Sequence, residues 1–113
     1  MAKYTCELQG TMQQFCQYLK NELIRSSFSA SLEEEDYYHI HDINIGTLVF
    51  ERYSYTGKNR LSLTVNVVEH HNHIRATAMS SGGSQALFFK INTFGEDAFL
   101  DKFKEASKKF KVY

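Results

Sequence analysis

The sequence predicts an α+β fold in which one antiparallel sheet of about five or six strands carries two helices on one face, in the order β-α-β-β-β-β-α. Several segments alternate apolar and polar residues with a period of two, which is typical of half-buried strands. Two other segments, near residues 12–25 and 93–110, carry apolar residues at helical spacing. Short connections between the segments favour antiparallel pairing of neighbours. The length of 113 residues suits one compact domain, so we expect a single domain over residues 1–113.

The N-terminal residues are expected to form a strand and then a helix. Alternate apolar residues mark the strand before Gly10: Ala2, Tyr4, Cys6 and Leu8. Thr11, followed by Gln14, fits a capping box, in which each side chain accepts a hydrogen bond from the other residue's backbone N–H. One face of a helix over residues 12–25 is then apolar: Met12, Phe15, Cys16, Leu19 and Leu23.

The central residues are expected to form strands around an acidic run, Glu33 to Asp36. Apolar alternation predicts one strand over residues 28–33 and a second over 37–41, which places the acidic run at or near a turn. A clearer hairpin follows, with β-forming residues from 47 to 55 and a turn over 57–59. Alternate apolar residues of its second strand share one face: Leu61, Leu63, Val65 and Val67.

The segment EHHNH, residues 69–73, is expected to be the reversal into one further strand. Alternate apolar residues mark that return strand: Ile74, Ala76 and Ala78. Histidine and asparagine are among the few non-glycine residues that tolerate positive φ. His70, His71 and His73 are also metal-ligand types, but ring directions are expected to diverge at a turn. An ordinary polar turn is therefore favoured over a metal site.

The C-terminal residues are expected to form one more short strand and then an amphipathic helix. Residues 85–91, QALFFKI, follow two adjacent glycines and suit a strand. Thr93 and Glu96 fit a second capping box. One stripe of the helix is apolar: Phe99, Phe103, Ala106 and Phe110. A curved sheet around such a helix resembles the helix-grip architecture of many small ligand-binding domains, which is a likeness of fold alone.

Two segments, LVFERYSYTGKNRLSLTV and SSGGSQALFFKINTFGE, are together similar to an uncharacterised family of small bacterial proteins that is grouped as a domain of unknown function. The resemblance extends over nearly the whole chain. It implies one intact bacterial domain, and it implies no activity, cofactor or catalytic residue.

The composition limits the classes of partner. Thirteen basic side chains balance thirteen acidic ones, so the chain lacks the positive field that concentrates nucleic acid, and no nucleic-acid partner is expected. No stretch approaches the roughly 18 apolar residues that would span a bilayer, so no membrane partner is expected. Cys6 and Cys16 stand at apolar positions and are interpreted as reduced core thiols. The N-terminal residues contain no apolar run of signal-peptide length, so the cytoplasm is the expected location.

No catalytic motif is found, and the chain is expected to be a non-enzymatic protein without a cofactor. The first hypothesis is a site for a small apolar or amphipathic molecule between the sheet and the C-terminal helix. Its candidate residues are Tyr53, Tyr55, Phe89, Phe99 and Phe103. The sequence leaves open whether this core is filled or hollow. Gly82 and Gly83 are candidates for a backbone contact with a ligand, although a bulge or wide turn between strands is favoured.

Two alternatives stay open. The chain could instead be a protein-interaction module, such as a homodimer, that uses a sheet edge or a patch of tyrosines. A more distant alternative is a metal site at His39 and His41, because alternate residues of a strand point to the same face and Asp42 is close in sequence. Two imidazoles still leave a tetrahedral site short of a third protein ligand.

Overall fold

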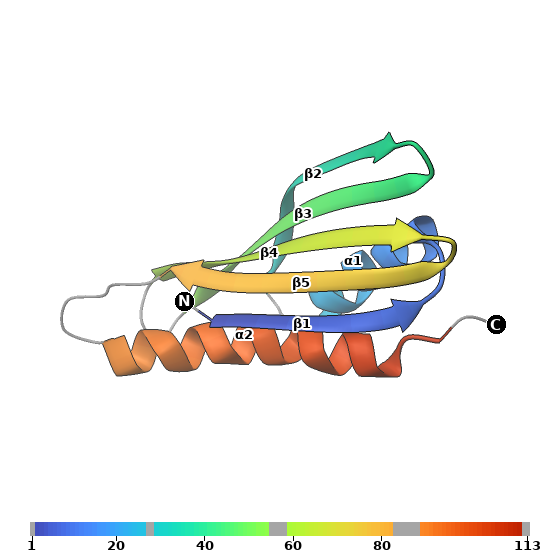
Figure 1. The fold of residues 1–113 in the computed structure, drawn as a ribbon. Helices are drawn as coiled ribbons and strands as arrows, with labels where there is room; N and C mark the ends of the chain where they lie inside the picture. Colours follow the sequence, from blue (N-terminus) through green and yellow to red (C-terminus); the bar gives the residue numbers. More distant parts are fainter. Residues whose placement is uncertain (1, 27–28, 55–58, 83–88, 112–113) are drawn as a thin grey trace.

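The computed structural model describes residues 2–26, 29–54, 59–82 and 89–111, in which five strands and two helices are found. In chain order they are β1 (Ala2–Gln9), α1 (Met12–Ser26), β2 (Ser31–Ile40), β3 (Ile43–Ser54), β4 (Asn59–His70), β5 (His73–Gly82) and α2 (Phe89–Lys109). The strands form one open antiparallel sheet in the order β1-β5-β4-β3-β2 (Figure 1). The predicted α+β class and the order β-α-β-β-β-β-α are confirmed.

Two short turns lie at one end of the sheet. Residues 41–42 join β2 to β3, and residues 71–72 join β4 to β5. His71 and Asn72 both have positive φ, 50° and 65°, as a two-residue type I′ hairpin turn requires. The reversal predicted for EHHNH is therefore confirmed, and it uses residue types that tolerate left-handed backbone.

Helix α1 begins with the predicted capping box. The Gln14 amide donates a hydrogen bond to Thr11 Oγ1 (3.1 Å), and the Thr11 amide donates to Gln14 Oε1 (3.4 Å). Because the first amides of a helix have no partner within it, these bonds fix the residue at which α1 starts. The helix then runs from Met12 to Ser26, close to the predicted range of 12–25.

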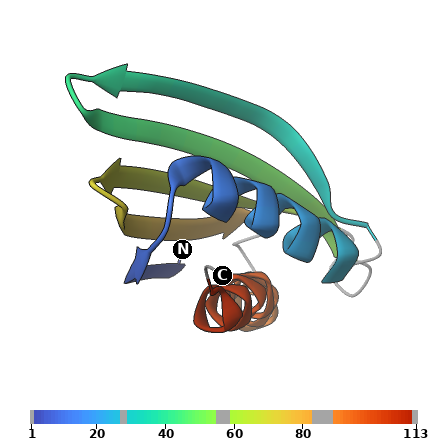
Figure 2. The ribbon, with the colours of Figure 1, turned by 90° about the vertical axis from the view of Figure 1, so that its right-hand side faces the viewer.

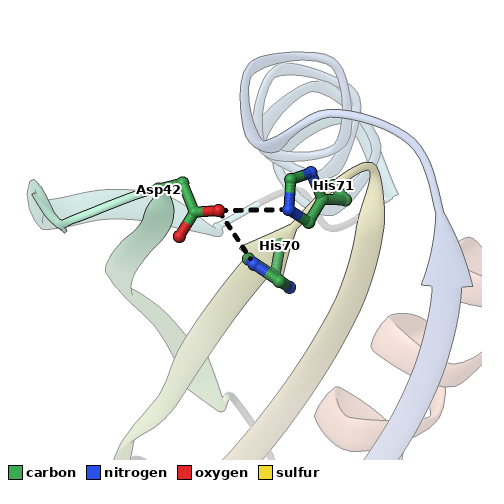
Figure 3. A group of neighbouring side chains, drawn as sticks. All are labelled: Asp42, His70 and His71. Atoms are coloured by element: carbon green, nitrogen blue, oxygen red, sulfur yellow. Dashed lines mark hydrogen bonds and ion pairs between the residues drawn. The ribbon is translucent and has the colours of Figure 1, made fainter.

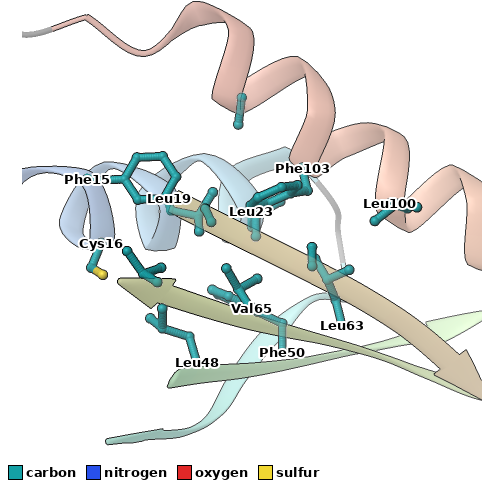
Figure 4. Close-up of a cluster of buried hydrophobic side chains, with 14 of the residues drawn as sticks. Phe15, Cys16, Leu19, Leu23, Leu48, Phe50, Leu63, Val65, Leu100 and Phe103 are labelled. Carbon is teal, nitrogen blue, oxygen red and sulfur yellow. The ribbon is translucent and has the colours of Figure 1, made fainter. Parts of the chain in front are cut away.

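Both helices lie on the concave face of the sheet, as predicted (Figure 2). The core between helices and sheet contains aromatic and aliphatic side chains that are fully buried (Figure 4). The largest of these are Phe15, Phe50, Phe99, Phe103, Leu19, Leu23, Leu48, Leu61 and Leu63. The Tyr18 hydroxyl joins the two helices by donating to the Ala106 carbonyl (2.7 Å). Burial of this apolar surface is the main term that stabilises the fold.

Helix α2 lies beside β1 and screens one side of the sheet (Figure 1). The Tyr4 ring meets Phe103 edge to face at 6.1 Å, and Lys104 Nζ lies 5.2 Å from the centre of the same tyrosine ring. Strand β2, at the other edge, has no comparable cover and contacts α1 only weakly. Within the described ranges, no helix combines the length and the apolar composition needed to cross a bilayer.

The predicted turn at the acidic run is wrong. Residues Glu33 to Asp36 lie inside one continuous strand, β2, whose pairing with β3 shifts register between Leu32 and Glu34. From Glu33 onward the residues of β2 are exposed, so charged side chains on either face remain in water. Backbone pairing with β3 thus holds the strand without the apolar alternation on which the prediction depended.

The predicted strand over residues 85–91 is wrong where the structure describes it. Helix α2 begins at Phe89, so Thr93 lies within the helix and is not its N-cap, while residues 83–88 lie outside the described residues. A short apolar run suits a strand or a buried helix equally well. Strand β5 already lies between β1 and β4, so no edge beside it is free for a further strand.

Replacing Phe103 with alanine tests the packing of α2 on the sheet. Phe103 is fully buried, so its removal is expected to lower the free energy of unfolding by about 3–5 kcal/mol. Lys108→Ala, at an exposed position of the same helix, is the control and should change it by less than about 0.5 kcal/mol. Urea unfolding followed by circular dichroism measures both. A loss below about 1 kcal/mol for Phe103→Ala would contradict the burial of this ring.

Candidate functional site

A groove of about 730 Å³ lies between the first half of α1 and the β2–β3 hairpin. Its lining combines residues from α1, β2, β3 and β4: Thr11, Met12, Gln13, Cys16, Gln17, Lys20, Tyr37, Tyr38, His39, Asn44, Ile45 and Glu69. In Figure 2, α1 lies inside the curve of the sheet, and the β2–β3 hairpin extends beyond it. The groove is therefore a product of sheet curvature and is open to solvent.

Helical spacing presents one side of α1 to the groove. Gln13, Cys16, Gln17 and Lys20 are separated by three, one and three residues and so lie along one stripe. This stripe adjoins the core-facing stripe at the buried residues Met12 and Cys16. The helix thus contributes an apolar inner wall and a rim of amide and ammonium groups.

Gly46 allows Tyr37 to lie against β3. A Cβ atom at position 46 would stand 2.9 Å from Tyr37 Cδ1 and 3.1 Å from Met12 Sδ, closer than van der Waals contact allows. Tyr37 is paired with Gly46 across the two strands. Its ring therefore covers the glycine and forms part of the groove wall, while 44% of the residue remains exposed.

A chain of hydrogen bonds spans the groove from α1 to β2. Glu35 Oε1 accepts from Lys20 Nζ (3.0 Å) and from the Tyr37 hydroxyl (2.7 Å). The hydrogen bond from Tyr37, followed by that from Lys20, lowers the pKa of Glu35. Burial, followed by the bond to Glu35, raises the pKa of Tyr37. At neutral pH the carboxylate is therefore charged and the phenol is protonated.

Glu69 is a buried carboxylate at the inner end of the groove, with 8% of its surface exposed. Its Oε1 accepts from the Met12 amide (3.1 Å) and from Asn44 Nδ2 (3.2 Å), and its Oε2 accepts from the Asn72 amide (3.3 Å). Burial alone raises the pKa of Glu69, but these three hydrogen bonds outweigh it and hold the pKa below its ordinary value. One carboxylate thus joins the start of α1 to β3 and to the β4–β5 turn.

Cys16 places a thiol in the lining of the groove, and the reactivity of this thiol is low. It is 2% exposed, and Sγ lies 3.4 Å from Met12 Sδ. Burial raises its pKa to about 11. Since the thiolate is the reactive form, this thiol is a poor nucleophile at neutral pH.

A second cluster lies at the hairpin tips, outside the groove lining. Asp42 Oδ2 lies 3.1 Å from Nε2 of His70 and 3.1 Å from Nε2 of His71 (Figure 3). The two imidazole rings meet edge to face, with centroids 4.0 Å apart. A hydrogen bond from its own backbone, followed by that from His70, lowers the pKa of Asp42. The expectation that ring directions diverge at this turn is wrong for His70 and His71, because Asp42 on the neighbouring hairpin attracts both.

The other predicted metal-ligating residues lie apart from this cluster. His39 lines the groove from β2, whereas His41 is in the β2–β3 turn with φ of 55°. His73 Nε2 lies 2.7 Å from Glu7 Oε1 on β1. Among the described residues, the group of three ligand atoms that lie close enough to share a metal is Asp42, His70 and His71. The proposed pair His39 and His41 does not belong to it.

The residues proposed to bind a ligand beside the C-terminal helix are separated by the structure. Phe99 and Phe103 are fully buried in the core. Tyr53 is 39% exposed and lies three residues from Phe50, hence on the opposite face of β3 from the helices. Tyr55 lies outside the described residues, and of Phe89 the structure describes its place in α2 alone.

The two glycines proposed as a backbone contact have one described member. Gly82 ends β5 opposite Leu61, has φ of 126°, and leaves no room for a Cβ, which would lie 2.4 Å from the Arg60 carbonyl oxygen. Close approach of β4 therefore explains this glycine. Gly83 lies outside the described residues.

Several residues of the groove were not identified from the sequence. Lys20 lies on α1 whereas Glu35 and Tyr37 lie on β2, and Glu69 falls in the segment expected to be a turn. The available signal was the second stripe of α1, in which polar residues recur at helical spacing beside the apolar face. Such a stripe ordinarily faces solvent, so it indicates a groove only once the sheet is known to overhang it.

Comparison with known proteins identifies a family. The model of a family described as "Family of unknown function (DUF6054)" matches residues 1–111. A search of curated proteins finds no match to the chain.

Replacing Glu69 with glutamine tests its structural role. At neutral pH the substitution is expected to lower the free energy of unfolding by about 1–3 kcal/mol, because a charged acceptor of three buried hydrogen bonds is lost. The folded-state pKa lies below the ordinary 4.5, so this contribution is complete above pH 4.5 and is lost as the pH falls through the folded value. Urea unfolding of both proteins across this range should show the difference shrinking in acid. A difference independent of pH would contradict the assignment.

Proposed function

This chain belongs to a family of unknown function, and we propose that it is a non-enzymatic domain that binds a small amphipathic molecule in the groove beside α1. The observation that carries this proposal is the groove itself. Its volume of about 730 Å³ lies within the range of known ligand pockets, roughly 300–1,000 Å³. We also propose that the protein is located in the cytoplasm, because both cysteines are free thiols.

The lining supports an amphipathic ligand. Met12 and Tyr37 offer apolar surface to a flat or aliphatic body. Gln13 and Gln17 offer amides that donate and accept hydrogen bonds at the rim. Few polar groups around an apolar surface fix the orientation of a ligand, which is the usual construction of small-molecule sites.

The groove is a better location than the interior beside α2. Phe99 and Phe103 have no exposed surface, and Leu100 retains 3%, so these described residues of α2 contribute to a filled core. A ligand there would have to displace packed side chains, which costs several kcal/mol. The groove requires no such displacement.

The state of the groove's ionisable groups supports binding rather than catalysis. The raised pKa values of Cys16 and Tyr37 keep both groups protonated at neutral pH, so neither is prepared as a nucleophile or a base. The Glu35 carboxylate already accepts two hydrogen bonds, and Glu69 accepts three. Both carboxylates are therefore engaged in hydrogen bonds that stabilise the structure.

Dye binding tests this proposal. The amphipathic probe 1-anilinonaphthalene-8-sulfonate is expected to bind the folded chain saturably with one-to-one stoichiometry, measured by fluorescence titration. Gln17→Trp, which fills the groove from α1, should weaken binding at least about tenfold. Asn21→Trp, one turn further along α1 and outside the lining, is the matched control and should change it less than about twofold. Circular dichroism confirms that both variants are folded.

Mass spectrometry of small molecules that copurify with the native chain, compared with Gln17→Trp, then identifies the ligand class. Unsaturable dye binding, or equal weakening by both variants, would contradict the groove as the binding site.

A second candidate function is favoured by the exposure of β2. This edge strand presents Tyr37, Tyr38 and Ile40 at 44%, 52% and 52% exposure. An unpaired edge with apolar side chains is a template for a strand from another chain. Antiparallel pairing of two copies about a twofold axis at Glu35, however, would set Glu34 opposite Asp36. We infer that the acidic run opposes self-pairing and leaves the edge to a different partner.

Neutralising the outward-facing acids of β2 tests the availability of this edge. The double variant Glu34→Gln with Asp36→Asn is expected to dimerise with increasing concentration in sedimentation velocity, while the native chain stays monomeric, because like-charge repulsion is removed. Asp101→Asn with Glu105→Gln makes the same charge change on exposed positions of α2 and should stay monomeric. Dimerisation of both variants, or of neither, would contradict edge pairing.

A further inference from the structure

The two short turns at one end of the sheet lie side by side. Strands β3 and β4 pair with Ile43 opposite His70, so continuing the register by one residue brings Asp42 level with His71. The β2–β3 turn therefore supplies a carboxylate, and the β4–β5 hairpin supplies two imidazoles (Figure 3). Residues some thirty positions apart in sequence meet because the register requires it.

The distances match those of a metal-ligand set. Metal–ligand bonds of about 2.0–2.1 Å at tetrahedral angles place neighbouring ligand atoms about 3.3 Å apart. Asp42 Oδ2 lies 3.1 Å from Nε2 of each histidine, and all three ligand atoms lie within 4.8 Å of one another. Two of the three edges of the ligand triangle are thus already close to the bound spacing.

The backbone of the turn that carries the histidines is fixed by hydrogen bonds of Asn72. The Asn72 amide donates to Glu69 Oε2 (3.3 Å), and the Asn72 carbonyl accepts from the Gly10 amide (2.8 Å). These bonds fix the type I′ turn next to His71 without using either imidazole. Little further ordering of the backbone would be needed when an ion binds, which lowers the entropic cost of binding.

We propose that Asp42, His70 and His71 form a binding site for a divalent transition-metal ion of the Zn²⁺ class. Two imidazoles and one carboxylate suit Zn²⁺ and its neighbours, whereas Mg²⁺ and Ca²⁺ prefer sites made of oxygen ligands. The three residues are exposed, so water can occupy the fourth position. A bound ion would join the β2–β3 turn to the β4–β5 turn. This site is separate from the groove, and the proposal does not depend on ligand binding there.

Isothermal titration of the untagged, chelator-treated chain with Zn²⁺ tests the proposal. One equivalent is expected to bind. Asp42→Asn, His70→Gln and His71→Asn should each weaken the affinity at least about tenfold. Asparagine is used at position 71 because it tolerates the positive φ there.

Two matched controls separate this cluster from histidine content in general. His41→Asn makes the same exchange at the other histidine with positive φ, and His73→Gln removes the third histidine of the same hairpin. Both should leave the affinity within about twofold of the native value.

A spectroscopic readout locates the ion independently of affinity. In ¹H–¹⁵N spectra of the side chains, Zn²⁺ should shift the imidazole nitrogens of His70 and His71 and leave those of His39, His41 and His73 in place. Binding weaker than about 100 μM would overturn the proposal. So would equal weakening by the controls, or shifts spread over all five histidines. Thermal unfolding without metal shows whether each variant is folded.

Discussion

The hydrogen bonds of Glu69 set the arrangement on which the rest of the structure depends. A carboxylate with 8% exposure is costly to bury unless its oxygens are paired, and here the start of α1, the Asn44 side chain and the β4–β5 turn supply the donors. The Met12 amide is one of the helix amides that has no partner within α1. The buried carboxylate needs donors and the helix amide needs an acceptor, so each satisfies the other. Together they fix where α1 begins above the sheet.

The position of α1 explains why the two helices cover the sheet unevenly. Glu69 and Asn44 anchor the start of α1 to β4 and β3, the apolar stripe of the helix packs with α2 in the core, and Lys20 reaches Glu35 on β2. The overhanging β2–β3 hairpin then encloses the groove on its concave side and leaves an exposed strand at its edge. Groove and edge are thus two consequences of one placement. The Lys20–Glu35 ion pair is a link between the helix and this strand, but exposed pairs contribute little to stability.

The sequence predicts the elements whose signals are local. The Thr11–Gln14 capping box and the stripe of α1 identify that helix, and the alternation in β4 and β5 identifies their hairpin. The continuity of β2 through Glu33 to Asp36 is not predicted because this part of the strand has no buried face to impose alternation, and the start of α2 is not predicted because its apolar residues fit either element. The groove lining is drawn from four elements, so no window of sequence contains it. The contact between Lys20 and Glu35 therefore could not be predicted from the positions of the two residues in the sequence or from composition.

The cluster at the hairpin tips shows what additional knowledge would have sufficed. Strands β3 and β4 each contain 12 residues and pair without a register shift, so the turns at their far ends must lie level. Once the EHHNH turn is centred on residues 71–72 and the β2–β3 turn on 41–42, register alone places Asp42 beside His71. The sequence therefore contained the cluster, but only through equal strand lengths. Within their own turn the imidazoles are expected to diverge, because the carboxylate that brings His70 and His71 together belongs to the neighbouring hairpin.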